Sequence, residues 1–288
     1  MISSLGAISL MGVTPLASCS PPATTQDFQS TGNAYDLNDP IETLQLFEKL
    51  RGDLSGKMVY SLSKGRVFGI RPDQTEQLTD FGKEVLRFTG CSMRIKRVLE
   101  NGNVETKSRS WLLYQDPISG AFIDELKNPY TGETVVVPPF RGGISGNIMT
   151  PQGPEVKASF SMESTAIGKP LDLVINQIGN RVHVTRHAFT KWLEKKTNTY
   201  RTEMTLDTFD FDQKYLNDQS YTHIPSDTHW TSQTSWLSLL NMSGTPGHMI
   251  WSSNSNVLFD IDELPSTFVN ATREKQPDIF NEPLIWED

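Results

Sequence analysis

The chain has 288 residues, of which 36% are hydrophobic and 21% are charged, and its formal net charge is −8 at pH 7. This composition is that of a folded globular protein and argues against global disorder. The acidic excess disfavours binding to nucleic-acid phosphates or to an anionic membrane surface, since both need clustered cations. One local cluster is basic, namely Arg94, Lys96 and Arg97 with Lys107 and Arg109, and we interpret it as a solvated sheet face.

The N-terminal segment resembles an export signal. No charged side chain precedes Asp27, and residues 5–16 are mostly apolar or small, which suits the core of a signal peptide and is too short to span a bilayer. The small residues that end at Cys19 resemble a bacterial lipobox, in which this cysteine carries a lipid anchor. The usual basic segment is missing, and an apolar tail is the alternative. We predict export to the periplasm or cell envelope, with residues 1–35 as signal and tether and Cys19 as the membrane contact.

Asp39 and Pro40 predict the start of a short helix. An aspartate there accepts hydrogen bonds from free backbone N–H groups, and proline fits the first helical position. The residues that follow place an apolar stripe on one side of this helix. They are Ile41, Leu44, Leu46, Phe47 and Leu50.

Residues 57–137 predict consecutive antiparallel strands, because each apolar segment is followed by turn chemistry. Asn-Gly tolerates the positive φ of a tight hairpin, and proline fixes φ at a corner. The predicted turns are residues 63–65, 101–103, 116–120 and 128–133. We expect no helix longer than two turns in this region, apart from the weakly patterned residues 74–83.

The second half of the chain has weaker signals. We predict strands at residues 156–162, 171–175, 181–189 and 199–209, and a hairpin turn at residues 254–256. The glycine-rich residues 141–154 predict a long loop, and the polar residues 217–235 predict another. Pro265 begins a predicted closing helix that extends to Lys275.

These elements predict a mostly β protein with a few short helices. An antiparallel meander of this length tends to curl, so we expect a barrel-like, calycin-like sheet whose interior holds a small molecule. Residues 36–288 form one predicted domain, and a boundary near residues 140–155 stays open.

Several motifs, in this order, resemble a bacterial and fungal family known as domain of unknown function 1838. Near the start these are residues 37–40 and 49–57; in the predicted hairpins they are residues 112–117 with Gly120, and residues 128–133. Near the end, residues 235–237 are followed by Met242, Gly244, Pro246 and Gly247. The resemblance covers about residues 36–275. Members often carry export signals, which agrees with the N-terminal segment, but the resemblance implies no activity.

The histidines offer two candidate arrangements. His183 and His187 lie on a predicted strand, where four residues span about 13 Å, too far to share a metal ion at about 2.1 Å from each. Together with Arg181 and Thr185 they form a polar row, which is either a solvated outer face or a site for binding or proton transfer. A second group, His223, Asp227 and His229, has the ligand types of a zinc or iron centre. No further ligand suggests itself, so we predict no metal and no cofactor.

Two functional classes follow. In the first, the protein is a cofactor-independent isomerase, lyase or hydrolase that acts on a small apolar or aromatic molecule. His187 or His183 would be the general base, and Arg109 or Arg186 would stabilise negative charge. In the second, it is an envelope lipoprotein that binds the molecule without turnover. In either class we predict a pocket lined by Trp111, Trp236, Trp251 and His248, for which core packing is the alternative. The oligomeric state stays open.

Overall fold

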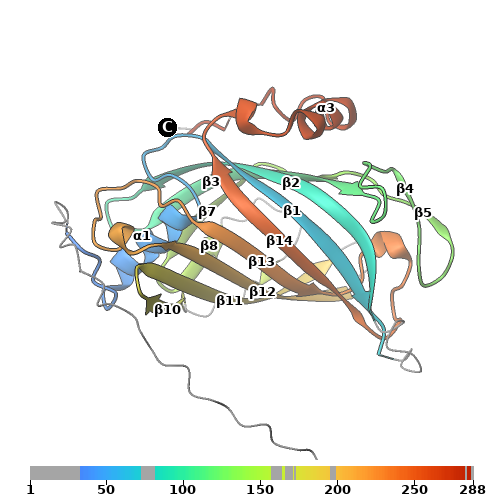
Figure 1. Ribbon diagram of the computed structural model, residues 1–288, viewed down its shortest axis with the longest axis horizontal. Coiled ribbons are helices and arrows are strands. Elements are labelled where there is room, and N and C mark those ends of the chain that lie inside the picture. Colours follow the sequence, from blue (N-terminus) through green and yellow to red (C-terminus); the bar gives the residue numbers. More distant parts are fainter. Residues whose placement is uncertain are drawn as a thin grey trace, which may run out of the picture.

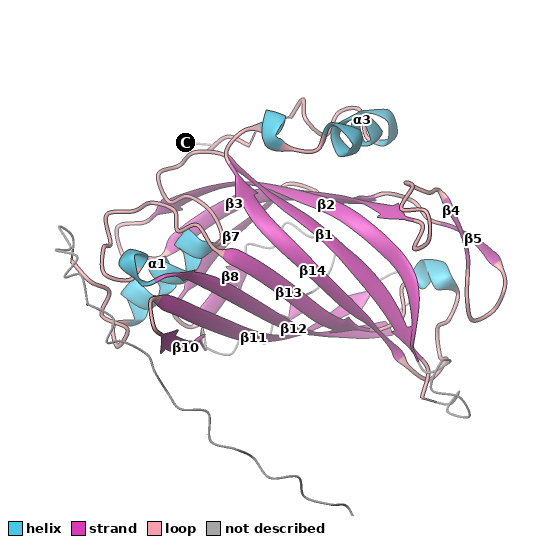
Figure 2. Cartoon of the chain, in the orientation of Figure 1, coloured by secondary structure: helices cyan, strands magenta, loops and turns pink. Residues whose placement is uncertain are grey.

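The computed structural model describes residues 33–72, 82–156, 164–165, 171, 173–194, 199–282 and 284–286. Within them the chain forms one 12-stranded antiparallel sheet, a separate two-stranded hairpin and two α-helices (Figures 1 and 2). The prediction of a mostly β, antiparallel protein is confirmed. No helix in this part of the chain combines the length and the apolar character needed to cross a membrane.

The strands of the large sheet follow the order β10-β11-β12-β13-β14-β1-β2-β3-β7-β8, with β6 beside β3 and β9 beside β11. In chain order, the first six strands of this sheet are β1 (Val59–Ile70), β2 (Gly82–Val98), β3 (Val104–Gln115), β6 (Phe140–Arg141), β7 (Ser145–Thr150) and β8 (Gly153–Val156). The later six are β9 (Ser164–Thr165), β10 (Leu173–Ile178), β11 (Arg181–Glu194), β12 (Thr199–Asp212), β13 (Asp227–Thr234) and β14 (His248–Leu258). Most strands pair with a neighbour in sequence, and the pairing of β14 with β1 joins the two halves of the chain.

Between residues 57 and 137 the predicted strands form, with one rearrangement. Strands β1, β2 and β3 pair in sequence, and Gly102 makes the predicted turn before β3 with φ +82°. The next hairpin, β4 (Glu125–Lys127) and β5 (Thr134–Val136), leaves the large sheet and pairs only with itself among the described strands. No helix lies in the described part of this region, and the weak helical pattern at residues 74–83 falls largely outside it.

The predicted turn at residues 63–65 is wrong, because these residues lie inside β1. Gly65 allows a close approach instead of a reversal. A Cβ atom at this position would lie 2.6 Å from the ring of Phe88 and 2.4 Å from the carbonyl oxygen of Ser252. The ring belongs to β2 and the carbonyl to β14, the two strands that flank β1, so a larger side chain would force them apart.

Three predictions for the second half are also wrong. The predicted loop at residues 141–154 contains β7 and β8, and the predicted loop at residues 217–235 contains β13. The predicted hairpin at residues 254–256 lies inside β14, which continues to Leu258. Strand β13 and the second half of β14 are rich in serine, threonine and asparagine, and the short strands β7 and β8 have few apolar residues, so all carry a weak strand signal. The strands predicted from residues 171, 181 and 199 are confirmed.

Helix α1 (Pro40–Leu50) forms as predicted. The carboxylate of Asp39 accepts hydrogen bonds from the backbone N–H groups of Ile41 and Glu42. Its buried side chains pack against one face of strands β11 and β12, which we call the α1 face. The core at this contact contains Leu46, Phe47 and Leu50 of the helix with Val182, Val184, Phe209 and Phe211 of the sheet.

Helix α3 (Ser266–Lys275) is the predicted closing helix, and it covers the opposite face of β1–β3, which we call the α3 face. Phe268 stacks on Trp111 with 6.3 Å between the ring centroids. The residues of the sheet in this core are Tyr60, Leu62, Cys91, Met93, Ile95, Trp111 and Leu113.

The hairpin β4–β5 packs on the α1 face at the end of β1 distant from α1. Leu126 and Val135 of the hairpin share a core with Val67 of β1 and with Trp236. The hydroxyl of Tyr130 donates to the carbonyl oxygen of Gly69 at 2.5 Å, which fixes the loop of the hairpin against β1. The middle of the α1 face therefore lies between two packed ends.

Candidate functional site

A cavity of about 430 Å³ lies on the α1 face, between α1 and the core beneath the β4–β5 hairpin. Residues from seven strands line it, namely β12, β13, β14, β1, β2, β3 and β6, together with Leu50 and Arg51 at the end of α1. Many of these side chains, such as Ser61, Ser63, Ser92 and Arg94, share one face because alternate residues of a strand point the same way.

Aromatic side chains form the wall of the cavity that is distant from α1. Phe88 lies 5.3 Å from Trp251 and 6.4 Å from Trp230 between ring centroids, and the two indoles lie 6.3 Å apart. Gly65 makes room for the ring of Phe88 at the centre of this group. The indole N–H of Trp251 donates to Thr234 at 3.1 Å, so its ring is fixed in place.

Serine hydroxyls cover the middle of the cavity. The hydroxyl of Ser110 donates to that of Ser92 at 3.0 Å, and the hydroxyls of Ser63 and Ser255 lie 2.6 Å apart. Gly90 lies between the aromatic wall and Ser92 on β2 and adds no side chain to the space. This part of the cavity offers short polar groups that both donate and accept hydrogen bonds.

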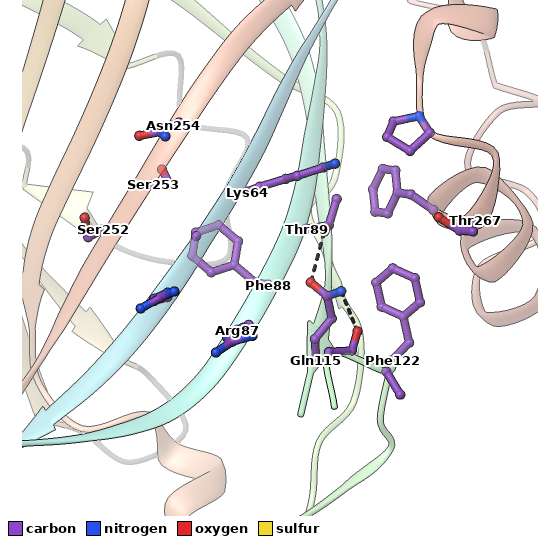
Figure 3. A pocket seen from close by; sticks show the side chains of 16 residues that line it. Lys64, Arg87, Phe88, Thr89, Gln115, Phe122, Ser252, Ser253, Asn254 and Thr267 are labelled. Atoms are coloured by element: carbon purple, nitrogen blue, oxygen red, sulfur yellow. Dashed lines mark hydrogen bonds between the residues drawn. The ribbon is translucent and has the colours of Figure 1, made fainter. Parts of the chain in front are cut away.

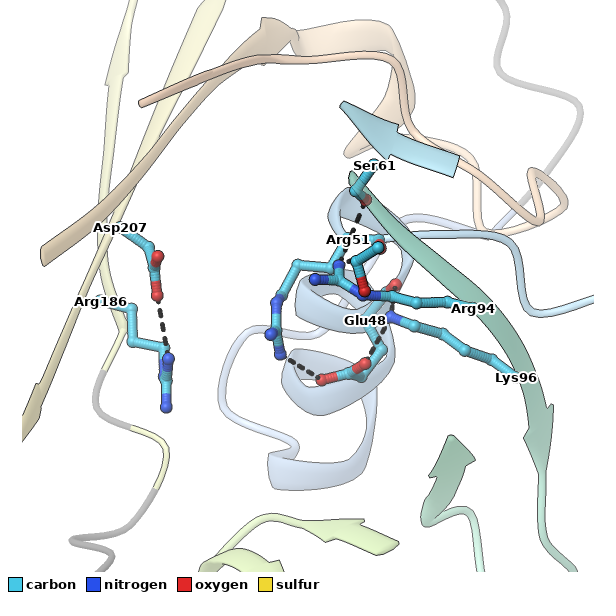
Figure 4. Close-up of polar contacts among 8 residues, drawn as sticks. Glu48, Arg51, Ser61, Arg94, Lys96, Arg186 and Asp207 are labelled. Carbon is cyan, nitrogen blue, oxygen red and sulfur yellow. Dashed lines mark hydrogen bonds and ion pairs between the residues drawn. The ribbon is translucent and has the colours of Figure 1, made fainter. Parts of the chain in front are cut away.

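At the α1 end, four cations and two carboxylates gather. We call Arg51, Arg94, Lys96 and Arg186 with Glu48 and Asp207 the arginine cluster (Figure 4). The ammonium group of Lys96 lies 2.5 Å from the Glu48 carboxylate, and Arg51 contacts the other oxygen of that carboxylate at 3.3 Å. Arg186 pairs with Asp207 at 2.9 Å.

Phe47 holds two of these cations. The guanidinium of Arg51 lies 5.0 Å from the centre of its ring, and that of Arg186 lies 5.3 Å from the same centre. A cation at this distance is attracted by the negative face of an aromatic ring. Phe47 is itself fixed by an edge-on contact with Phe209, 5.8 Å between centroids.

Arg94 is held through two of the three nitrogens of its guanidinium. Nε donates to Ser92 at 3.2 Å, while Nη1 donates to the carbonyl oxygen of Arg51 at 3.2 Å and to Ser61 at 3.3 Å. Among the described residues, Nη2 donates to no protein atom. Because Arg94 lines the cavity, its Nη2 group is available to a bound molecule.

Burial is the largest influence on the pKa values of the cluster. It lowers the pKa of Arg94 to about 10, with a further contribution from Arg51, and lowers the pKa of Lys96 to about 8. For Glu48 burial acts upwards, yet Lys96 and Arg51 together hold its pKa at about 2. Each group therefore keeps its charge at neutral pH.

A second pocket, about 700 Å³ in volume, lies on the α3 face (Figure 3). It runs between β1 and β2 on one side and the start of α3 on the other. Its basic residues, Lys64, Arg66 and Arg87, stand at the solvent, and Glu84 accompanies Arg87 at 2.6 Å and Arg66 at 3.8 Å. The side chains of Arg66 and Arg87 are 59% and 34% exposed, so water screens their charge more than that of the buried arginine cluster, and this pocket is the weaker candidate.

The predicted polar row lies on the face opposite the cavity. His183 pairs with Asp210 and keeps 43% of its side chain exposed, and His187 is exposed. Their neighbours Val182 and Val184 are fully buried beneath α1. Neither histidine lines the cavity, and a catalytic role for them stays a prediction.

The two arginines predicted to stabilise negative charge lie on opposite faces of the sheet. The side chain of Arg186 points to the face of β11 opposite that of His183 and His187, and it belongs to the arginine cluster. Arg109 is only 2% exposed on the α3 face, where it pairs with Glu282 and donates to the carbonyl oxygen of Ile279 at 3.2 Å. It fastens the C-terminal segment to β3.

The residues predicted to line a pocket also separate. Trp251 lines the cavity as predicted, whereas Trp236 packs against Tyr130 under the β4–β5 hairpin. Trp111 borders the cavity, but its indole stacks under α3 and donates to Thr272 at 3.3 Å. His248 begins β14 and does not line the cavity.

The candidate metal ligands do not converge. His223 lies 3.0 Å from the carbonyl oxygen of Gly52, Asp227 pairs with Arg181, and His229 lies 2.7 Å from Asn254. Among the described residues no three side chains of histidine, cysteine, aspartate or glutamate are grouped to hold a metal ion.

The basic residues around Arg94, which we interpreted from the sequence as one solvated sheet face, are partly buried. Lys96 is 1% exposed, Arg94 lines the cavity and Arg109 is buried on the α3 face, so the interpretation as a solvated face is wrong for these three residues. The physical reason is that α1 packs over Lys96 and Arg94. Arg109 is covered by the C-terminal segment. A signal existed, since Phe88, Gly90, Ser92, Arg94 and Lys96 alternate with the apolar residues Cys91, Met93 and Ile95, which lie on the face that α3 covers.

Comparison with known proteins gives a family and no activity. A search of curated proteins found no match. The model of a family described as protein of unknown function (DUF1838) matches residues 55–288, which include nearly all of the sheet, the cavity and α3. The chain therefore belongs to this DUF1838 family of proteins of unknown function.

Proposed function

We propose that the protein binds a small molecule with an apolar or aromatic body in the cavity of the α1 face. The observation that carries the proposal is a cavity of about 430 Å³ with three aromatic rings at one end and hydroxyl groups in the middle. Ligand sites in proteins combine such an apolar wall with a few polar groups that fix orientation. Trp230 and Trp251 would stack on the body of the ligand.

The sheet would enclose the ligand as a barrel-like wall. Asp207 of β12 and Ser110 of β3 line the same cavity although these strands are five positions apart in the sheet. Neighbouring strands lie about 4.8 Å apart, so a flat sheet would separate the two residues by about 24 Å. Their shared cavity supports a curled sheet of the calycin type.

Binding without turnover fits the site better than catalysis. The predicted bases, His183 and His187, lie on the opposite face. Asp207 is the carboxylate among the described residues that line the cavity, and Arg186 holds it at 2.9 Å. The guanidinium of Arg186 thus already occupies this carboxylate.

We also propose that the protein acts outside the cytoplasm, tethered at Cys19. The uncharged apolar stretch before Asp27 supports this, although it lies outside the described residues. Fractionation of cells that express the full reading frame tests it. We expect the protein in the membrane fraction, and we expect C19S to move it to a soluble fraction; full-length cytoplasmic protein would contradict the proposal.

The binding proposal is tested with N-phenylnaphthylamine, a neutral aromatic probe whose fluorescence rises in apolar surroundings. We expect saturable binding at one site per chain. The variant S63L extends a side chain into the cavity, and its matched control K64L places the same side chain on the opposite face of β1. We expect S63L to weaken binding about tenfold or more and K64L to leave it unchanged. Equal affinity for both variants would refute the proposal.

A further inference from the structure

The positive charge of the arginine cluster exceeds its negative charge. It has four cations and two carboxylates, and both carboxylates are already occupied, Glu48 by Lys96 and Arg51 and Asp207 by Arg186. Arg94 has no carboxylate partner among the described residues; its protein contacts are two hydroxyls and a carbonyl oxygen. A buried cation without a counterion is costly, since the protein interior solvates it less well than water.

Arg94 lines the cavity and has one guanidinium nitrogen, Nη2, to offer to a bound molecule. Its Nη2 group has no protein acceptor among the described residues, while Nε and Nη1 are held by Ser92, Ser61 and Arg51 (Figure 4). The side chain is therefore fixed before a ligand arrives and loses little conformational freedom on binding. Arg51 lines the same end of the cavity and donates to Glu48 through Nη1.

The polar end and the aromatic end of the cavity lie on one strand. Phe88 and Arg94 are six residues apart on β2 and point to the same face, which separates their Cα atoms by about 20 Å. A ligand that fills this space has its polar group at one end and its apolar body at the other.

We infer that the ligand is an organic anion, whose acidic group binds Arg94 and Arg51 while its aromatic or apolar body lies against Phe88, Trp230 and Trp251. The inference rests on the proposed function and adds the chemical class of the ligand. A carboxylate, a sulfonate and a phosphate monoester share the chemistry required, two or three acceptor oxygens with negative charge.

Two probes that differ in one group test the inference. Anilinonaphthalene sulfonate carries an anionic group on nearly the same aromatic body as the neutral N-phenylnaphthylamine. We expect the native protein to bind the sulfonate at least about tenfold more tightly, because a hydrogen bond between charged groups is worth more than one with a neutral partner. We expect R94Q to abolish this preference and to change the affinity for the neutral probe less than twofold.

Matched variants separate a local effect from a loss of net charge. R66Q removes the same charge from β1 on the opposite face, where 59% of the side chain is exposed, and we expect it to leave both affinities unchanged. R94K keeps the charge without the planar edge, and we expect an intermediate preference. A thermal melt of each variant shows whether it is folded. If R94Q does not fold, R51Q carries the same test, since 29% of the Arg51 side chain is exposed.

The outcomes distinguish the two proposals. If both probes bind equally and S63L weakens both, the inference of an anionic ligand is overturned and the binding proposal stands. If neither probe binds, or S63L has no effect, the binding proposal itself fails. If R66Q instead of R94Q removes the preference, the anion binds in the pocket of the α3 face and the inference is overturned. Displacement of the sulfonate by decanoate, decyl phosphate and decanol then tests the class of acid; we expect the two anions to compete and decanol to compete less.

Discussion

The ammonium group of Lys96 lies 2.5 Å from the carboxylate of Glu48, and each side chain is only 2% exposed. This buried pair joins α1 to β2 at the end of the cavity. Lys96 also donates to the carbonyl oxygen of Glu48 at 2.8 Å, so the charge is held by the helix backbone as well as by the carboxylate. Arg51, three residues beyond Glu48, contacts the other oxygen of the same carboxylate at 3.3 Å.

We predict that either partner of this pair is costly to remove alone. E48Q and K96M should each lower the free energy of unfolding by about 3–5 kcal/mol, because each leaves a buried charge without its nearest charged partner. The double variant should lose less unfolding free energy than the sum of the two single losses, and the difference, the coupling energy, should be about 1–3 kcal/mol. Urea unfolding of the four proteins measures it, and additive losses would contradict a direct pair.

The same pair predicts loss of stability in acid. The cations Lys96, Arg51 and Arg94 lower the pKa of Glu48 from its ordinary value of 4.5 to about 2. The unfolded state therefore takes up a proton first as the pH falls, and the contribution of Glu48 to stability is lost between about pH 4.5 and pH 2. Unfolding free energies at pH 6 and pH 3 should differ less for E48Q than for the native protein. An identical difference in both proteins would show that other carboxylates dominate.

Gly65 gives a prediction about packing. G65V should destabilise the protein by about 2–4 kcal/mol, because its side chain would overlap the Phe88 ring and the Ser252 carbonyl. The control is G143A, where a Cβ meets no atom within 4 Å and the free energy of unfolding should stay within about 0.5 kcal/mol. Equal stability of the two variants would mean that β14, β1 and β2 do not approach as closely as this geometry requires.

The histidines test the choice between binding and catalysis. H183N and H187N should leave the affinity for both probes unchanged, because both positions lie on the face opposite the cavity. Fluorescence titration measures it, and S63L provides the positive control. A loss of affinity in either histidine variant would show that the polar row of β11 contributes to the binding site.

Local signals in the sequence predicted the elements that depend on local chemistry. Asp39 caps α1 and Gly102 turns the chain before β3, as their residue types require. Gly65 could not be interpreted in this way, because its role depends on Phe88, which lies on the next strand. Strand β13 was missed because its face outside the core is polar and its inward residues are mostly serine and threonine.

The candidate site was only partly predictable. Alternation along β11 correctly placed Arg181, His183 and His187 on one face, but which face lies inside depends on α1, whose contact with Val182 and Val184 spans over a hundred residues of sequence. The burial of Arg94 and Lys96 depends on the same helix. Neither fact follows from periodicity within a strand.

The most direct test of the account is a crystal structure of the protein with anilinonaphthalene sulfonate bound. We predict the sulfonate within hydrogen-bond distance of Arg94 Nη2 and the aromatic rings between Phe88, Trp230 and Trp251, with the contacts of Arg94 to Ser61 and Ser92 retained. A probe bound instead between α3 and the strands, beside Lys64 and Arg66, would contradict it.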